Sequence, residues 1–343
     1  MVLDTSSEMY LRIVIEIKKS EEVQLKLDSI MEYTVVIRTL GTAGNKYQTL
    51  LDSLAKQTIQ PSRIVVYIAE GYKLPKESIG REEYIYVPKG MVAQRALSYN
   101  EVESEYILFL DDDVYLPENA VEGLYDHLVR NKADVIAADV FPNAERPFLK
   151  RLMMAISGRM IARKDDGKWG YKVMRNAGYS YNRNPKPGVY WSQTNAGPCF
   201  FCSKENFLKI RFEEERWVDE MKYALGEDQV MYYKAYLLGL KQLTWFHSGI
   251  RHLDAGSALY DENKTQRVIY ADFYFKVVFW HRFIVLPEKS ILFRIWDIVC
   301  IAYTLLFTFL ISLLKLNFTV FKLKLNAVRE GIKFIQSDYY RSI

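Results

Sequence analysis

Short apolar runs alternate with amphipathic segments through the first part of the chain. Runs rich in Val, Ile and aromatic residues predict buried strands, and segments with apolar residues three or four positions apart predict helices. The predicted strands lie at 34–37, 63–69, 83–87, 106–110 and 133–140, and the predicted helices at 47–56 and around 92–99. Strands that alternate with helices at this spacing indicate an α/β fold with a mostly parallel central sheet flanked by helices.

The middle of the chain has a less regular pattern. An amphipathic basic segment at 148–164 suits a surface helix, a lid beside a site, or a patch facing anionic lipid. Residues 165–188 are rich in Gly, Asn, Lys and Pro and predict a long loop. Ordered structure is expected again at 190–201, and 217–239 contain a predicted helix whose start carries Gly226, Glu227 and Asp228. The helix dipole favours acids in the first turn, which is the ordinary explanation of this pair.

The last quarter of the chain is apolar and aromatic. Residues 298–314 form an uncharged apolar run of 17 residues, the short limit for a helix that spans a membrane, and a basic tail follows it. A single span would put this tail outside and the rest of the chain inside, against the positive-inside rule. The pattern therefore favours a helix in the membrane interface or a re-entrant hairpin. A buried helix of the soluble fold and a true span are the alternatives.

Composition narrows the class of protein. A chain of 343 residues with 50% apolar content can hold one large domain and an appendage. The net charge of +4 is small and gives no indication of nucleic-acid binding. Three cysteines do not make a disulfide framework, and the N-terminus shows no secretory signal. A reducing, cytosolic environment is therefore expected.

Three carboxylates, Asp111 to Asp113, follow the predicted buried strand 106–110. Adjacent carboxylates repel one another and are poorly placed at a buried strand end unless a cation binds there. Strand alternation sends Asp111 and Asp113 to the same side. Mg²⁺ and Mn²⁺ prefer oxygen ligands, and open α/β sheets bind ligands at the carboxyl ends of their strands. The pattern predicts a metal–phosphate site, with a solvated acidic turn as the alternative; His252 is either a third ligand or a structural residue.

The chain resembles family 2 glycosyltransferases with the GT-A fold in the ordered segments TVVIRT, LLDSLAKQT, RIVVYIAEG, EYILFLDDD, NAGPCFF, GEDQ and GIRHLDAGS. The resemblance covers residues 33–257. It implies a metal-dependent enzyme that moves a sugar from a nucleotide diphosphate sugar, a UDP-sugar first of all, to a hydroxyl of a glycan or lipid-linked acceptor, with inversion. The Gln-x-x-Arg-Trp sequence of polymerising synthases is absent after Asp228, where the chain reads QVMYY, so transfer of a single sugar is expected.

The resemblance also assigns roles to individual residues. Asp113 and Asp111, with His252, would bind Mn²⁺ or Mg²⁺, and Asp228, beside Glu227, would act as the general base. The nucleotide sugar would contact Arg38, Thr39, Leu40, Glu70, Arg95, Asp111 and Asp112. Two of these depart in part from the family pattern: Glu70 stands where the family has Asp before Gly, and Arg95 matches the Arg of an A-R-N-like sequence but is flanked by Gln94 and Ala96.

The expected organisation has three regions. They are an N-terminal extension (1–31), a glycosyltransferase domain (32–257, with a nucleotide-sugar-binding half at 32–140 and an acceptor half at 141–257) and a C-terminal helical, membrane-associating region (258–343). The family and the apolar tail suggest a peripheral or monotopic enzyme on the cytoplasmic face of the inner membrane, in cell-surface polysaccharide or lipopolysaccharide synthesis. A catalytically inactive sugar-nucleotide-binding or membrane scaffold is the alternative. A metal-dependent phosphohydrolase is disfavoured, because Tyr115 occupies the Thr/Val position of its D-x-D-x-[T/V] pattern.

Overall fold

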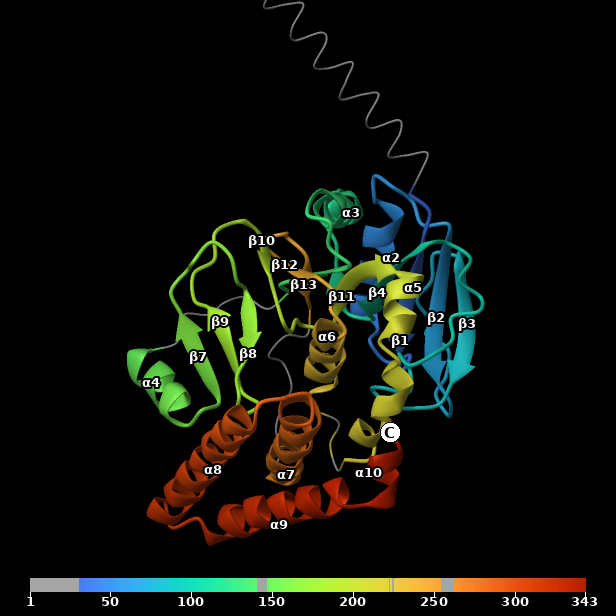
Figure 1. Ribbon diagram of the computed structural model, residues 1–343. Helices are drawn as coiled ribbons and strands as arrows, with labels where there is room; N and C mark the ends of the chain where they lie inside the picture. Colours follow the sequence, from blue (N-terminus) through green and yellow to red (C-terminus); the bar gives the residue numbers. More distant parts are fainter. Residues whose placement is uncertain (1–30, 141–146, 222, 224, 254–261) are drawn as a thin grey trace, which may run out of the picture.

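An eight-stranded sheet with helices on both faces forms the centre of the molecule (Figure 1). The computed structural model describes residues 31–140, 147–221, 223, 225–253 and 262–343, so the extension predicted at 1–31 lies almost wholly outside the described residues. From one edge to the other the strands are β10 (Gly188–Trp191), β12 (Gln242–Phe246), β6 (Val135–Ala138), β11 (Cys199–Ser203), β4 (Tyr106–Asp111), β1 (Tyr33–Thr39), β2 (Arg63–Ala69) and β3 (Glu82–Val87).

The sheet is mostly parallel, as the sequence predicts. Strands β4, β1, β2 and β3 run parallel to one another, and β12 runs parallel to β6. The exceptions are β11, which lies antiparallel between β4 and β6, and β10, which is antiparallel to β12 at the edge. The predicted fold class is confirmed.

Strand β4 shows why its apolar run is continuous rather than alternating. Successive side chains of a strand point to opposite faces. Ile107 and Phe109 enter the core on one face, whereas Leu108 and Leu110 enter the core on the other. Because helices cover both faces, both sets are buried.

The two faces are covered by different helices. On one face, α2 (Asn45–Ala55) and α3 (Ala120–Arg130) bury leucines such as Leu54 and Leu124. On the other face, α5 (Lys204–Lys209) and α6 (Glu227–Leu237) bury Phe207 and Val230. Gly226 precedes α6 with φ of 84°, and a Cβ atom there would contact the Phe275 ring within 2.5 Å. The positive φ and the lack of room for a Cβ atom both favour glycine at this helix start.

Two predicted elements differ in the structure. Residues 92–99 form turns rather than a helix, and 165–188 are not a loop. Within the latter range, β9 (Tyr179–Asn182) pairs with β8 (Tyr171–Val173) on one side and with β7 (Met160–Arg163) on the other, which makes a small three-stranded sheet. The helix predicted within 217–239 begins at Glu227, after Gly226, as expected, and a 3-10 helix, η1 (Phe212–Val218), precedes it. The sequence does not reveal the strands of the small sheet, because they are short and mostly polar. They show neither the two-residue alternation of a strand nor the 3.6-residue period of a helix.

The C-terminal helices pack against the rest of the molecule (Figure 1). They are α7 (Glu262–Phe279), the π-helical segment η2 (Trp280–Val285), α8 (Ile291–Leu314), α9 (Phe318–Ile335) and α10 (Asp338–Ser342). One side of α7 buries Phe273 against Ala327 of α9, and its other side adds Phe275 and Phe279 to the core that contains Trp217. Helix α8 lies beside the shorter α4 (Phe148–Ile156), with which it shares a hydrogen bond.

Candidate active site

The carboxylates after β4 are brought to His252 by a two-stranded ribbon. Strand β5 (Val114–Tyr115) pairs with β13 (Arg251–His252), and the Leu253 amide donates to the Asp113 carbonyl at 2.8 Å. This pairing places His252 Nε2 3.0 Å from Asp113 Oδ1. Strand β4 ends at Asp111, so the alternation expected for Asp111 and Asp113 does not extend to Asp113.

Asp111 is held by two arginines. Arg38 Nε and a terminal nitrogen contact its two oxygens at 2.5 and 3.1 Å, and Arg95 lies 3.3 Å from Oδ1. Burial acts to raise the pKa of Asp111, but the charges of Arg38 and then Arg95 hold that pKa below its ordinary value. Asp111 is therefore a carboxylate whose partners are cationic side chains of the chain itself.

Asp112 has a different environment. Its Oδ2 accepts a hydrogen bond from Thr39 Oγ1 at 2.5 Å, and Thr39 Oγ1 accepts in turn from the Gly41 amide at 2.7 Å. Burial, together with the charges of Asp113 and Asp111, raises the pKa of Asp112 to about 6. Asp112 thus fixes the loop after β1, which carries Thr39, against the end of β4.

Arg95 joins the strand-end cluster to Asp228 at the start of α6. Its guanidinium lies 2.9 Å from Asp228 Oδ1 and donates to the Gly197 carbonyl at 3.0 Å, and the Gly197 amide donates to Asp228 Oδ2 at 2.9 Å. Arg95 is 3% exposed, and Asp228 is 28% exposed. A buried guanidinium and an amide thus orient a carboxylate that solvent and a ligand can reach.

Glu227, the neighbour of Asp228, is buried. Its carboxylate lies 3.6 Å from the Arg38 guanidinium. Burial and then the charge of Asp228 raise the pKa of Glu227 above its ordinary value, although Arg38 and Arg95 oppose that shift. Of the two acids, Asp228 is the more accessible and Glu227 the more enclosed.

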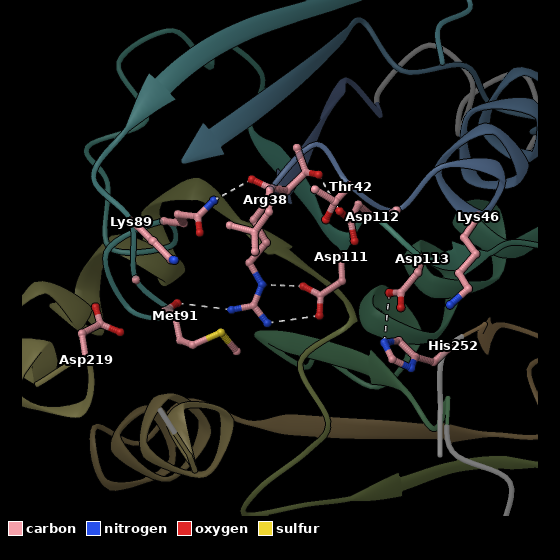
Figure 2. Close-up of a pocket in the computed structure, with 15 residues that line it drawn as sticks. Arg38, Thr42, Lys46, Lys89, Met91, Asp111, Asp112, Asp113, Asp219 and His252 are labelled. Carbon is pink, nitrogen blue, oxygen red and sulfur yellow. Dashed lines mark hydrogen bonds and ion pairs between the residues drawn. The ribbon is translucent and has the colours of Figure 1, made fainter. Parts of the chain in front are cut away.

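A cavity of about 660 Å³ lies over the carboxylates (Figure 2). Its lining includes Asp111, Asp112 and Asp113, and also two lysines, Lys46 and Lys89. The remaining lining residues are Arg38, Thr39, Leu40, Thr42, Ala43, Gly90, Met91, Gln94, Asp219 and His252. A lining that combines cationic side chains with carboxylates suits an anionic ligand bound with a metal ion.

Asp219 shapes one wall of this cavity. Its two oxygens accept hydrogen bonds from the Val92 and Ala93 amides at 3.0 and 2.8 Å, and a Cβ atom at Gly90 would overlap the carboxylate. This contact satisfies the Val92 and Ala93 amides at the start of the segment predicted to be helical, and so holds that segment in place beside the cavity.

The structure brings together most of the residues that the sequence singles out. Arg38, Thr39 and Leu40 line the cavity with the carboxylates and His252. Arg95 lies outside the cavity lining and contacts Asp111 and Asp228 instead. Glu70 is exposed and is also outside that lining. Lys46, Lys89 and Asp219 were missed, because a lone Lys or Asp on a loop or helix end carries no sequence signal.

A divalent ion would fit between Asp113 and His252. The described part of the chain holds no cluster of three Asp, Glu, His or Cys side chains suited to a metal. Both oxygens of Asp111 face Arg38, so Asp113 and His252 are the two side chains left to ligate. A carboxylate and an imidazole, completed by phosphate oxygens and water, are ligands that Mn²⁺ or Mg²⁺ accepts.

The fold and this site define an α/β protein with a candidate nucleotide and metal site. Residues 48–182, less than half of the chain, match the model of a family described as glycosyl transferase family 2, in agreement with the resemblance seen in the sequence. The matched range includes Arg95 and the three strand-end carboxylates, but neither Asp228 nor His252.

Two further comparisons complete the picture. No curated protein gives a significant match to the chain. A solved structure described as GalNAc-T7 with UDP, GalNAc and Mn²⁺ is similar with a TM-score of 0.46 and 13% sequence identity. The similarity covers 80% of this chain and 56% of that one, so this chain spans little more than half of that protein's length.

Proposed function

We propose that this protein transfers a single sugar from a nucleotide diphosphate sugar to an acceptor hydroxyl, with inversion at the anomeric carbon. The observation that carries the proposal is the cavity at the end of β4, whose lining combines Asp113 and His252 with Arg38 and two lysines. A diphosphate needs both a metal ion and cationic side chains, and this cavity offers ligands for the first and supplies the second.

Asp113 and His252 would hold Mn²⁺ or Mg²⁺ together with the diphosphate of the donor, most simply a UDP-sugar. A bound divalent ion would neutralise charge on the leaving diphosphate. Arg38, Lys46 and Lys89 line the same cavity and would bind the phosphates by charge-assisted hydrogen bonds. Asp112 would hold Thr39, and with it the loop after β1, in place along the nucleotide.

Asp228 is the proposed general base. Its position between the Arg95 guanidinium and the Gly197 amide fixes the direction of its lone pairs, and it is accessible to an acceptor. Glu227 is less suited, because its side chain is buried beside Arg38 and is less accessible to an acceptor. Inversion rests on the family resemblance, since a base on the face opposite the leaving group gives a single in-line displacement.

The acceptor that we propose is a glycan or a lipid-linked sugar at the cytoplasmic face of the inner membrane. The support is the sequence after Asp228, which lacks the polymerase motif, and the exposed apolar helix α8. A role in cell-surface polysaccharide or lipopolysaccharide synthesis is part of this proposal.

Release of nucleoside diphosphate from a panel of sugar nucleotides tests the proposal. Turnover, including slow hydrolysis with water as acceptor, should need Mn²⁺ or Mg²⁺ and stop with EDTA. Asp228→Asn should lower kcat by about a hundredfold or more, the usual contribution of a general base, while leaving donor binding intact. Full activity of Asp228→Asn would remove the base from the proposal.

The inactive scaffold remains the second candidate, and the same assay separates it. A scaffold would bind a sugar nucleotide without releasing diphosphate under any metal condition. The contacts that orient Asp228 favour the enzyme, because a purely structural acid would not need to stay accessible.

A further inference from the structure

Helices α4 and α8 together present a large exposed apolar surface. The large apolar side chains of α8 that face outward include Leu292, Trp296 and Leu306, of which Leu292 is 75% and Leu306 67% exposed. Helix α4 buries none of its residues and exposes Phe148 and Leu149. The two helices are joined where Tyr303 Oη donates to the Ile156 carbonyl at 2.9 Å. A patch of this extent on a water-soluble surface marks an interaction site.

The opposite side of α8 carries polar side chains, and residues elsewhere in the protein form an ion pair or hydrogen bonds with them. Asp297, Thr304 and Ser312 are spaced so that they share one face of the helix, and all three are buried. Each has a partner: Arg175 lies 2.8 Å from Asp297, Asn176 donates to Thr304 at 2.7 Å, and Lys324 donates to Ser312 at 2.9 Å. The partners are therefore distributed along the length of α8.

This distribution argues against both a span and a core helix. In a span, the loop that carries Arg175 and Asn176, and the charged end of Lys324, would have to enter the hydrocarbon region beside α8. Charged groups and irregular backbone are costly there. A core helix would not leave its apolar side in water. A helix in the plane of a bilayer surface satisfies both sides, because its polar stripe stays on the protein and its apolar side enters the lipid.

The charges around the apolar surface indicate the kind of lipid. Lys289 and Lys315 flank the two ends of α8, and Arg294 lies in its first turn. Lys150 lies on α4 and is exposed, as is Arg159 just beyond its end. Neither helix carries an acid except Asp297, which is buried and paired with Arg175. Cations without exposed acids complement anionic headgroups.

We propose that α4 and α8 form one in-plane docking surface for an anionic lipid bilayer. The surface lies apart from the nucleotide cavity, so the inference does not require the proposed sugar transfer. It deepens the proposed function in one respect, since docking would hold the catalytic domain beside a lipid-linked acceptor.

Flotation of the full-length protein with vesicles tests the docking surface. Phosphatidylcholine vesicles with phosphatidylglycerol should bind the protein, and pure phosphatidylcholine vesicles should bind it much less. The double variant Leu292→Glu/Leu306→Glu should lower partitioning by about tenfold or more, because two exposed leucines no longer enter the lipid. Val129→Glu on α3, also at an exposed apolar residue, is the matched control and should bind as the wild type does.

Binding that is unaffected by the double variant would overturn the proposal. So would a wild-type dimer, measured by light scattering without lipid, that dissociates in the double variant, because a second copy would then cover this surface. Thermal unfolding of each variant shows whether it is folded. Nucleoside diphosphate binding by the double variant separates a failure of docking from a failure of the proposed transfer.

Labelling at the two ends of α8 separates an in-plane helix from a span. Lys289→Cys and Lys315→Cys, each in a Cys300→Ser background, are synthesised in the presence of vesicles and treated with a maleimide that does not cross membranes. Both variants should react from outside, since the in-plane helix keeps both ends on one side. Protection of one end alone would show a span and contradict the proposal.

Discussion

Arg95 lies 2.9 Å from Asp228 and connects that acid to the end of β4 through its contact with Asp111. Asp228 thus belongs to the same charged cluster as the strand-end carboxylates, although it lies on α6, which comes after strand β11 in the sequence. The cluster couples the stability of the domain to the orientation of the proposed base.

Replacement of Arg95 should destabilise the protein strongly. In Arg95→Met the buried cation is lost, and removal of one partner of a buried ion pair costs roughly 3 to 5 kcal/mol. The loss of stability should lie near the lower end of this range, because Asp111 still contacts Arg38 and Asp228 is partly exposed. Urea unfolding measures the change.

Arg130→Met is the control for this prediction. Arg130 pairs with Asp126 on the surface of α3 and is 75% exposed, so its loss should cost less than about 1 kcal/mol. If the two variants lose equal stability, the buried cluster does not have the role described above.

A side chain at Gly197 should disturb the proposed base. A Cβ atom there would overlap the Asp228 carboxylate and approach Arg95. Gly197→Ala should therefore lower kcat by about tenfold or more, because a base must lie within hydrogen-bond reach of its proton. Gly239→Ala strains the backbone, because φ is 86°, but its Cβ atom would meet nothing within 4 Å, so it tests whether strain away from Asp228 lowers kcat as much. Wild-type kcat in Gly197→Ala would contradict the geometry.

Asp112 should make the metal-free protein less stable as pH rises. Its pKa is about 6 in the folded protein and 3.8 ordinarily, so the folded state binds the proton more tightly. The stabilising contribution is present below pH 3.8 and is lost as pH rises through about 6. At about 1.4 kcal/mol for each pKa unit, the loss is about 3 kcal/mol.

Asp112→Asn should remove this dependence. The variant should show a flatter profile of unfolding free energy between about pH 4 and pH 7, and it should be more stable than the wild type at pH 7. Asp338→Asn, at a fully exposed side chain, should leave the profile unchanged. A parallel shift of the whole curve in Asp112→Asn would show that the pKa of Asp112 is not raised.

The lysines of the cavity should contribute to nucleotide affinity. Hydrogen bonds to charged groups contribute about 1.5 to 3 kcal/mol, so Lys46→Gln and Lys89→Gln should each weaken binding of the matching nucleoside diphosphate by about tenfold. Lys56→Gln is the control, because Lys56 is exposed and lies at the opposite end of α2 from Lys46. Titration calorimetry in the presence of Mn²⁺ measures the dissociation constants, and an equal effect at Lys56 would indicate only long-range charge.

The sequence predicts the parallel core of the fold well, for a physical reason. Strands such as β1, β2 and β4 are buried on both faces, and their continuous apolar runs end sharply at polar residues. It fails where composition does not decide the backbone conformation. Residues 92–99 have helical composition but form turns, and Tyr99 adopts φ of 52°, outside the helical range.

The same contrast holds in the site. The acids after β4 stand out because charge directly follows an apolar strand. The contact between Asp113 and His252 depends on a ribbon of β5 and β13, two residues in each strand, which no periodicity reveals. The partners of Asp111 could not be foreseen either, because Arg38 and Arg95 reach it from separate parts of the chain.

The most direct test of the account is thermal unfolding with a panel of nucleoside diphosphates, each with and without Mn²⁺. A ligand that binds only the folded state raises the melting temperature. The account predicts a rise with one nucleotide that requires Mn²⁺, disappears in Asp113→Asn and persists in Asp338→Asn. No rise with any nucleotide, or a rise that neither Mn²⁺ nor Asp113→Asn affects, would contradict a donor site built on Asp113 and His252.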